Sequence, residues 1–217
     1  MEGGAIGSNS GIRLADIGDF RKVDETMTVT QASLFSTLLV LLSARIGNVG
    51  GDSLNKLFDQ FGLESVVGLV AILTILLQFG RYVYSMTYGG YGKPWSPFIF
   101  VCIIISVQLI HDAMYSYGIL GIVPKGKNEL IDAIRAYAYE AKRYAFAGHA
   151  VLIGATALIA MLLQDVGDLE KYIFIAITVY AIVYALSGVP RPQVPAAVIA
   201  PPPKKEPMGD MRGGRFY

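Results

Sequence analysis

The sequence predicts an all-α fold: a polytopic bundle of transmembrane helices with one amphipathic surface helix and an extended Pro-rich tail. Of the 217 residues, 53% are hydrophobic and only 16% are charged, whereas about 25% of the residues in a soluble domain are charged. Several apolar stretches approach the roughly 20 residues that a helix needs to cross about 30 Å of hydrocarbon. The last part of the chain is instead rich in proline. We therefore expect a multi-pass membrane protein in a lipid bilayer.

Composition divides the chain into four parts. They are an N-terminal polar segment at 1–26, an interfacial or spanning helix plus a loop at 27–64, a transmembrane helical domain at 65–189 that includes an amphipathic helix at 128–144, and a Pro/Gly/Lys/Arg-rich C-terminal tail at 190–217.

The first apolar stretch leaves two topologies open. Its uncharged window runs from Thr26 to Ala44, but its dense core, Leu34 to Leu42, is short. Lys and Arg in short loops collect on the cytoplasmic side of a membrane. If the chain has four spans and this stretch is not one of them, 15 Lys and Arg residues lie on one side of the membrane and 3 on the other. If the stretch also spans, the division is 12 against 6. The count favours four spans with both termini cytoplasmic, and a helix from Met27 to Ile46 that lies at the interface or packs on a partner.

Four later stretches have the length and bounding residues of membrane spans. Charged or aromatic residues flank each one, such as Arg81, Lys93 and Trp95 between the first two, as is typical of anchors at a membrane interface. The expected spans are Ser65 to Phe79 with a continuation through Tyr84, Trp95 to Tyr117, Phe146 to Leu163, and Tyr172 to Val189.

An amphipathic helix is expected between the second and third of these four spans. Pro124 and Gly126 break the chain, and Asn128 then provides an N-cap. Glu129 and Asp132 fall in the first turn, where the helix dipole favours carboxylates. Apolar residues follow at helical spacing, so one face of the helix 128–144 should be apolar and the other charged.

The tail and the basic residues near the amphipathic helix are the expected partner-binding elements. A Pro-rich segment of this kind cannot form a core and adopts an extended, polyproline-like conformation along a partner. The predicted partner-binding residues are Lys125, Lys127, Arg135, Pro201, Pro202, Pro203, Lys204 and Lys205.

Ionisable residues within the spans are the main candidates for a polar site, because each is costly in the membrane. They are His111 and Asp112 in one span and His149 in another. One hypothesis makes them a proton relay or a weak metal site. The chain contains only two histidines, which is too few for paired haem ligation or a closed zinc site. We favour hydrogen bonds that hold the bundle together, and we expect no cofactor and no metal.

Small residues in the Phe146–Leu163 span favour close helix packing. Ala150, Gly154 and Ala157 fall on nearly the same helix face. The chain has no metalloprotease motif, nucleophile elbow or phosphate loop, so an enzyme is not expected. The balance of 18 Lys plus Arg against 17 Asp plus Glu provides no basic field for nucleic acid. The sequence leaves open whether the protein forms a homo-oligomer.

Part of the chain resembles a known family. The string Ser106 to Tyr115 (SVQLIHDAMY), followed by Val123 to Asn128 (VPKGKN) and by Ile131 to Ala133 with Tyr137 and Ala138, resembles multi-span membrane proteins of nucleo-cytoplasmic large DNA viruses, including the algal viruses. The resemblance covers about a third of the chain, and its motifs have no known chemistry.

The resemblance implies a structural role. It implies a minor capsid protein in the internal membrane of a virion, with capsid or other coat proteins as partners and with both termini on the cytoplasmic, capsid-facing side. The alternative is a small transporter or channel subunit that uses His111, Asp112 and His149.

Overall fold

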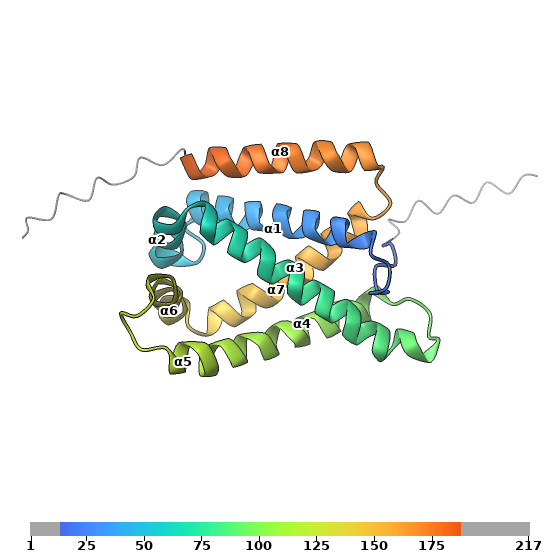
Figure 1. The fold of residues 1–217 in the computed structure, drawn as a ribbon, viewed down its shortest axis with the longest axis horizontal. Helices are drawn as coiled ribbons and strands as arrows, with labels where there is room; N and C mark the ends of the chain where they lie inside the picture. The colour runs from blue at the N-terminus through green and yellow to red at the C-terminus, as the bar shows by residue number, and fades with distance from the viewer. Residues whose placement is uncertain (1–13, 188–217) are drawn as a thin grey trace, which may run out of the picture.

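The computed structural model describes residues 14–187, and every regular element within them is helical (Figure 1). In chain order these are α1 (Glu25–Gly47), α2 (Gly51–Phe61), α3 (Leu63–Met86), η1 (Gly89–Tyr91), α4 (Pro97–Met114), η2 (Tyr115–Ile119), α5 (Leu120–Ile122), α6 (Glu129–Ala141), α7 (Arg143–Leu163) and α8 (Asp168–Ser187).

Five helical segments in the described part are long and apolar enough to cross a membrane. They are α1, α3 continued through η1, α4 continued through α5, α7 from Tyr144, and α8. The expected all-α, multi-pass architecture is confirmed at this level. The structure has one candidate span more than the four that the charge count favours.

The five long helices run between the same two ends of the molecule and alternate in direction (Figure 1). Helices α2 and α6 pack together at one end, which we call the α2/α6 end. At the opposite end, residues 14–24 cross the bundle beside the α3–α4 connection. We call residues 14–24 the strap, and this end the strap end.

Helix α1 lies at the centre of the bundle, between α3, α7 and α8. Its most apolar 18-residue window is 56% buried, against 17 to 33% for the other four candidate spans. Its hydroxyls bond within the protein: Ser33 to the carbonyl of Val29 (2.9 Å), and Ser36 with Thr156 of α7 (2.8 Å). These bonds allow a helix of modest hydropathy to be buried among other helices. An interfacial position for Met27 to Ile46 does not fit this arrangement.

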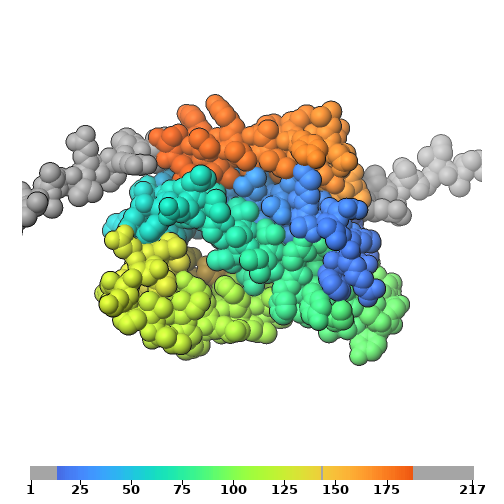
Figure 2. Space-filling view, in the orientation of Figure 1, coloured from blue at the N-terminus to red at the C-terminus, as the bar shows by residue number. Residues whose placement is uncertain are grey.

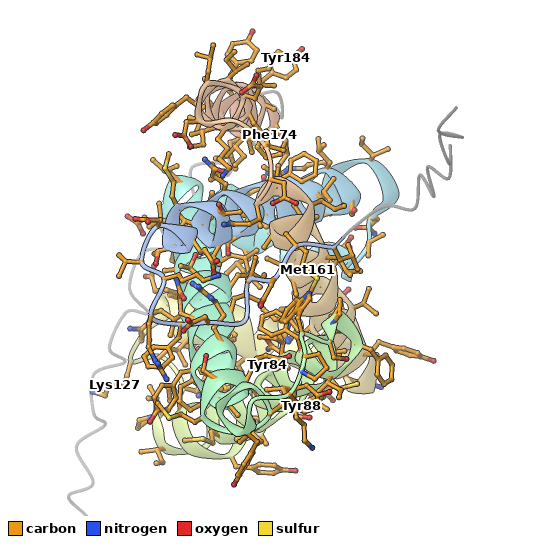
Figure 3. All side chains as sticks on the ribbon, turned by 90° about the vertical axis from the view of Figure 1, so that its right-hand side faces the viewer. Tyr84, Tyr88, Lys127, Met161, Phe174 and Tyr184 are labelled. Carbon is orange, nitrogen blue, oxygen red and sulfur yellow. The ribbon has the colours of Figure 1, made fainter. Side chains whose placement is uncertain are left out.

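Helix α8 lies along one edge of the bundle (Figure 2). It packs on α1, where Phe35 and Phe174 lie with ring centroids 5.0 Å apart. Figure 3 shows Phe174 directed towards the bundle and Tyr184 directed away from it. Only 17% of the apolar window of α8 is buried, so most of this helix faces outwards.

Helix α2 corrects the expectation of a loop after the first helix. Four apolar residues, Leu54, Leu57, Phe58 and Phe61, recur at helical spacing and give α2 one apolar face. Phe58 is only 2% exposed. Two glycines with positive φ make the entry to this helix: Gly50, at φ +91°, is the residue before it, and Gly51, at φ +80°, is its first residue.

A sharp break separates α6 from α7. Lys142 adopts a left-handed φ of 50°, which is unusual for a residue other than glycine. The amphipathic helix therefore ends at Ala141 and not at residue 144, and α7 begins at Arg143, three residues before the predicted span. Asn128 caps α6 as expected, because its side chain accepts a hydrogen bond from the amide of Ile131.

Candidate functional site

A buried carboxylate lies between two imidazoles where α4 and α7 meet. Asp112, near the end of α4, is 8% exposed. Its Oδ2 lies 3.0 Å from Nδ1 of His149 on α7, and its Oδ1 lies 3.4 Å from Nδ1 of His111. Gln108, one turn earlier on α4, donates a 2.8 Å hydrogen bond to Oδ1. The structure thus brings together the three ionisable residues singled out from the sequence.

The surroundings of this cluster connect it to the surface helix α6. The ring of Tyr137 on α6 lies 6.1 Å from the ring of His149. Burial, and secondarily the charge of Asp112, raises the pKa of the Tyr137 hydroxyl above its ordinary value. No group of three residues that could hold a metal ion occurs among residues 14–187. The arrangement can hold a proton between carboxylate and imidazole, and it ties α4, α6 and α7 together.

Two members of this site were missed from the sequence. Gln108 lies four residues before Asp112, so helical spacing alone could have placed both on one face. Tyr137 could not be found in this way, because its approach to His149 depends on how α6 folds back over α7.

The predicted packing residues lie on the face of α7 that meets α4. A Cβ atom at Gly154 would lie 3.7 Å from side chains of Val101 and Ile105, which is ordinary contact. Ala157 is fully buried, and Ala150 is half-buried.

The predicted partner-binding residues have three different environments. Arg135 pairs with Asp132 and donates hydrogen bonds to the carbonyls of Leu120 (3.0 Å) and Val123 (2.7 Å), so it fastens the end of α5 to α6. Lys125 and Lys127 are exposed in the loop between these helices. Residues 201–205 lie outside the described residues.

A carboxylate from α6 caps the start of α2. The two oxygens of Glu140 accept hydrogen bonds from the backbone amides of Asp52 (3.1 Å) and Ser53 (2.8 Å). Hydrogen bonding by Ser53, first through its side chain and then through its backbone amide, lowers the pKa of Glu140 below its ordinary value. A Cβ atom at Gly51 would lie 2.3 Å from Oε1 of Glu140, so only glycine permits this approach. The α2/α6 contact was not expected from the sequence.

A buried arginine fastens the strap to α3. The side chain of Arg81 is fully buried and forms an ion pair with Glu25 at the start of α1. It also donates hydrogen bonds to the carbonyls of Ile17 (2.6 Å) and Asp19 (2.6 Å). The sequence had suggested an interfacial anchor for Arg81, and the structure instead places it inside the protein.

Two concave regions lie on the surface of the described residues. A groove of about 460 Å³ runs between α1, α3 and α8, and its lining is almost entirely apolar. A smaller, polar pocket of about 240 Å³ lies between the strap and the α3–α4 connection.

Comparisons with protein-family models, with curated proteins and with solved structures find no match to this chain.

Proposed function

We propose that the protein is a five-span membrane anchor that attaches a lipid bilayer to a protein coat through its α2/α6 end. The observation that carries the proposal is the Glu140 cap, which joins two amphipathic helices outside the candidate spans into one surface. Arg135 fixes the loop in front of α6, and Lys125 and Lys127 project from that loop.

The charge distribution supports this orientation. With α1 as a span, 12 of the 18 Lys and Arg residues fall on the side of α2, α6 and the tail, and 6 fall on the strap side. The positive-inside bias then makes the α2/α6 end cytoplasmic. In this topology the N-terminal segment lies on the opposite side from the tail, which revises the expectation that both termini are cytoplasmic.

The coat that we propose is the capsid of a large DNA virus, which makes the chain a minor capsid protein of the virion membrane. The residues that resemble such viral proteins run from Ser106 to Ala138. They build the last part of α4, the loop with Lys125 and Lys127, and most of α6. The resemblance therefore falls on the elements that would face the coat.

Cross-linking mass spectrometry on the native membrane or particle tests the proposal. We expect links from Lys56, Lys125 and Lys127 to an abundant coat protein. Lys93 and Lys171 at the strap end are the internal controls and should give no coat links. Coat links from the strap-end lysines alone, in a sample with abundant coat-to-coat links, would refute the proposed orientation and attachment.

The cluster around Asp112 favours a second candidate, a proton-coupled transporter or channel subunit. Proteoliposomes with an internal pH dye discriminate between the two functions. Proton flux that Asp112→Asn abolishes, with an unchanged melting temperature, would favour transport. An anchor should show no flux above empty liposomes, and the same substitution should then change only stability.

A further inference from the structure

The polar pocket at the strap end contains charged side chains of both signs. Asp16, Asp19 and Arg21 come from the strap, and Lys93 comes from the α3–α4 connection. Among the described residues, none of these four side chains forms an ion pair with another charged side chain. The pocket therefore contains two carboxylates and two cations that make no direct ion pair with one another.

The two carboxylates are held in place through one oxygen each. Oδ1 of Asp16 accepts a hydrogen bond from the amide of Gly18 (2.9 Å), and Oδ1 of Asp19 accepts one from the amide of Arg21 (3.1 Å). Their Oδ2 atoms have no hydrogen-bond partner in the described structure and are available to a ligand.

The pocket is preformed because the strap is fastened on several sides. Ser85 donates to the carbonyl of Gly18 (2.7 Å) and accepts from the amide of Phe20 (3.2 Å). The indole of Trp95 donates to the carbonyl of Leu14 (3.3 Å). A Cβ atom at Gly18 would lie 2.7 Å from Tyr84 and Trp95, so the strap lies directly on these rings. Binding of a ligand would therefore cost little conformational entropy, because this backbone is already ordered.

The pocket lies where a lipid headgroup would lie. It is at the end of the candidate span of α3 and just before that of α4, and Tyr84, Tyr88 and Trp95 form an aromatic cluster there (Figure 3). Such aromatic residues mark the headgroup level of a bilayer. Pockets for drug-sized ligands begin at about 300 Å³, so 240 Å³ suits a small polar group.

We propose that this pocket binds the zwitterionic headgroup of a phosphatidylethanolamine-type lipid. A primary ammonium group has three N–H donors, which suit the free oxygens of Asp16 and Asp19. The lipid phosphate accepts from Arg21 and Lys93. A trimethylammonium group would instead need an open aromatic face, whereas the two aromatic residues that line the pocket pack inwards: Tyr84 is only 4% exposed, and Trp95 packs against Tyr84 and Phe100. The inference needs only that α3 and α4 cross the membrane, and it is independent of attachment to a coat.

Trp95 makes the test direct, because it is the only tryptophan in the chain and it lines the pocket. The full-length protein in detergent is titrated with short-chain phosphatidylethanolamine, phosphatidylcholine or phosphatidylglycerol while tryptophan fluorescence is recorded. We expect a saturable change with phosphatidylethanolamine, at least tenfold tighter than with either other lipid. Equal responses to all three lipids, or tighter binding of the anionic lipid, would overturn the proposal.

Matched variants locate the binding. Asp16→Asn with Asp19→Asn keeps the Oδ1 acceptors that shape the strap but removes both negative charges. This variant should bind phosphatidylethanolamine at least tenfold more weakly, because about tenfold is already expected from losing one charge-assisted hydrogen bond and the variant loses two. Asp165→Asn removes an exposed carboxylate at the same end outside the pocket and should bind like the wild type. Undiminished binding by a folded double variant would refute the site.

Discussion

The side chain of Arg81 has no exposed surface, and each of its three nitrogens donates a hydrogen bond inside the protein. Removing one partner of such a buried pair leaves an uncompensated charge, which costs more than the pair contributes while intact. The residue is therefore a sensitive position for stability, and it also holds the strap that forms one wall of the lipid pocket, although its own side chain does not line that pocket.

Arg81→Met should destabilise the protein by about 3–5 kcal/mol, because Glu25 stays buried and keeps only the exposed Lys22, 3.5 Å away, as an ionic partner. The double variant Arg81→Met with Glu25→Leu should recover part of this loss. Lys93→Met, an exposed cation at the same end, should change stability by about 0.5 kcal/mol or less. Unfolding in bicelles measures all three, and a double variant less stable than Arg81→Met would contradict the ion-pair argument.

The sequence identified His111, Asp112 and His149 as polar residues in spans, because an ionisable residue within an apolar run is easily recognised. It could not locate the partners of Arg81 outside α3, because Glu25 and the strap residues that it binds lie 56 to 64 residues away. Contacts within one helix follow from spacing, whereas contacts between helices depend on packing that spacing does not specify.

At the scale of elements, α3 and α4 approach closely at Gly80. A Cβ atom built there would lie 2.0 Å from Cδ1 of Ile104, which is fully buried. The absence of a side chain at residue 80 therefore sets the distance between these two helices.

Gly80→Ala should destabilise the bundle by about 1–3 kcal/mol through overpacking. Ile104→Val removes the clashing Cδ1, so adding it to Gly80→Ala should restore stability relative to the single alanine variant. Gly68→Ala in the same helix is the control, because a Cβ atom there meets nothing within 4 Å. Equal effects of the two alanine substitutions in an unfolding assay would show that close approach at Gly80 is unimportant.

The contact between α2 and α6 should depend on pH through Glu140. The pKa of Glu140 is lower in the folded protein than its ordinary value of 4.5, so folding favours the ionised carboxylate. The resulting stabilisation of the α2/α6 contact is fully present at pH values above 4.5. The stabilisation is lost as pH falls through the lowered pKa. Hydrogen exchange of the Asp52 and Ser53 amides, corrected for intrinsic rates, should show protection at neutral pH that disappears in this acidic range.

Glu140→Gln should abolish that pH-dependent step, since no charge is left to titrate. Glu129→Gln changes an exposed carboxylate at the other end of α6, away from the start of α2, and should retain the step. A step of unchanged size in Glu140→Gln would assign the pH dependence to another group.

For the whole molecule, the position of α1 decides the topology. Four later spans were predictable because their apolar runs are long and unbroken. Helix α1 was ambiguous because Ser and Thr lower its hydropathy, and the sequence does not reveal that these hydroxyls bond inside the bundle. Helix α2 was missed because its flanking glycines resemble a loop.

Cysteine labelling separates the two topologies. In a Cys102→Ser background, single cysteines at Arg21 and Val49 lie at opposite ends of α1 and should react with a membrane-impermeant maleimide from opposite sides. A cysteine at Tyr91, in η1 at the strap end, should react from the same side as the cysteine at position 21 and serves as the internal reference. Labelling of positions 21 and 49 from one side would restore the four-span arrangement.

The central position of α1 has a consequence for biosynthesis. Ribosomes make α1 before α3, α7 and α8, yet Gln31, Ser33, Ser36 and Thr37 are at most 2% exposed once those helices have packed around it. Until then the nascent helix would present these polar groups to lipid, where they are poorly tolerated. We therefore expect α1 to remain beside the insertion machinery until α8 emerges, so that release into the bilayer is delayed and the five helices leave as an assembled group.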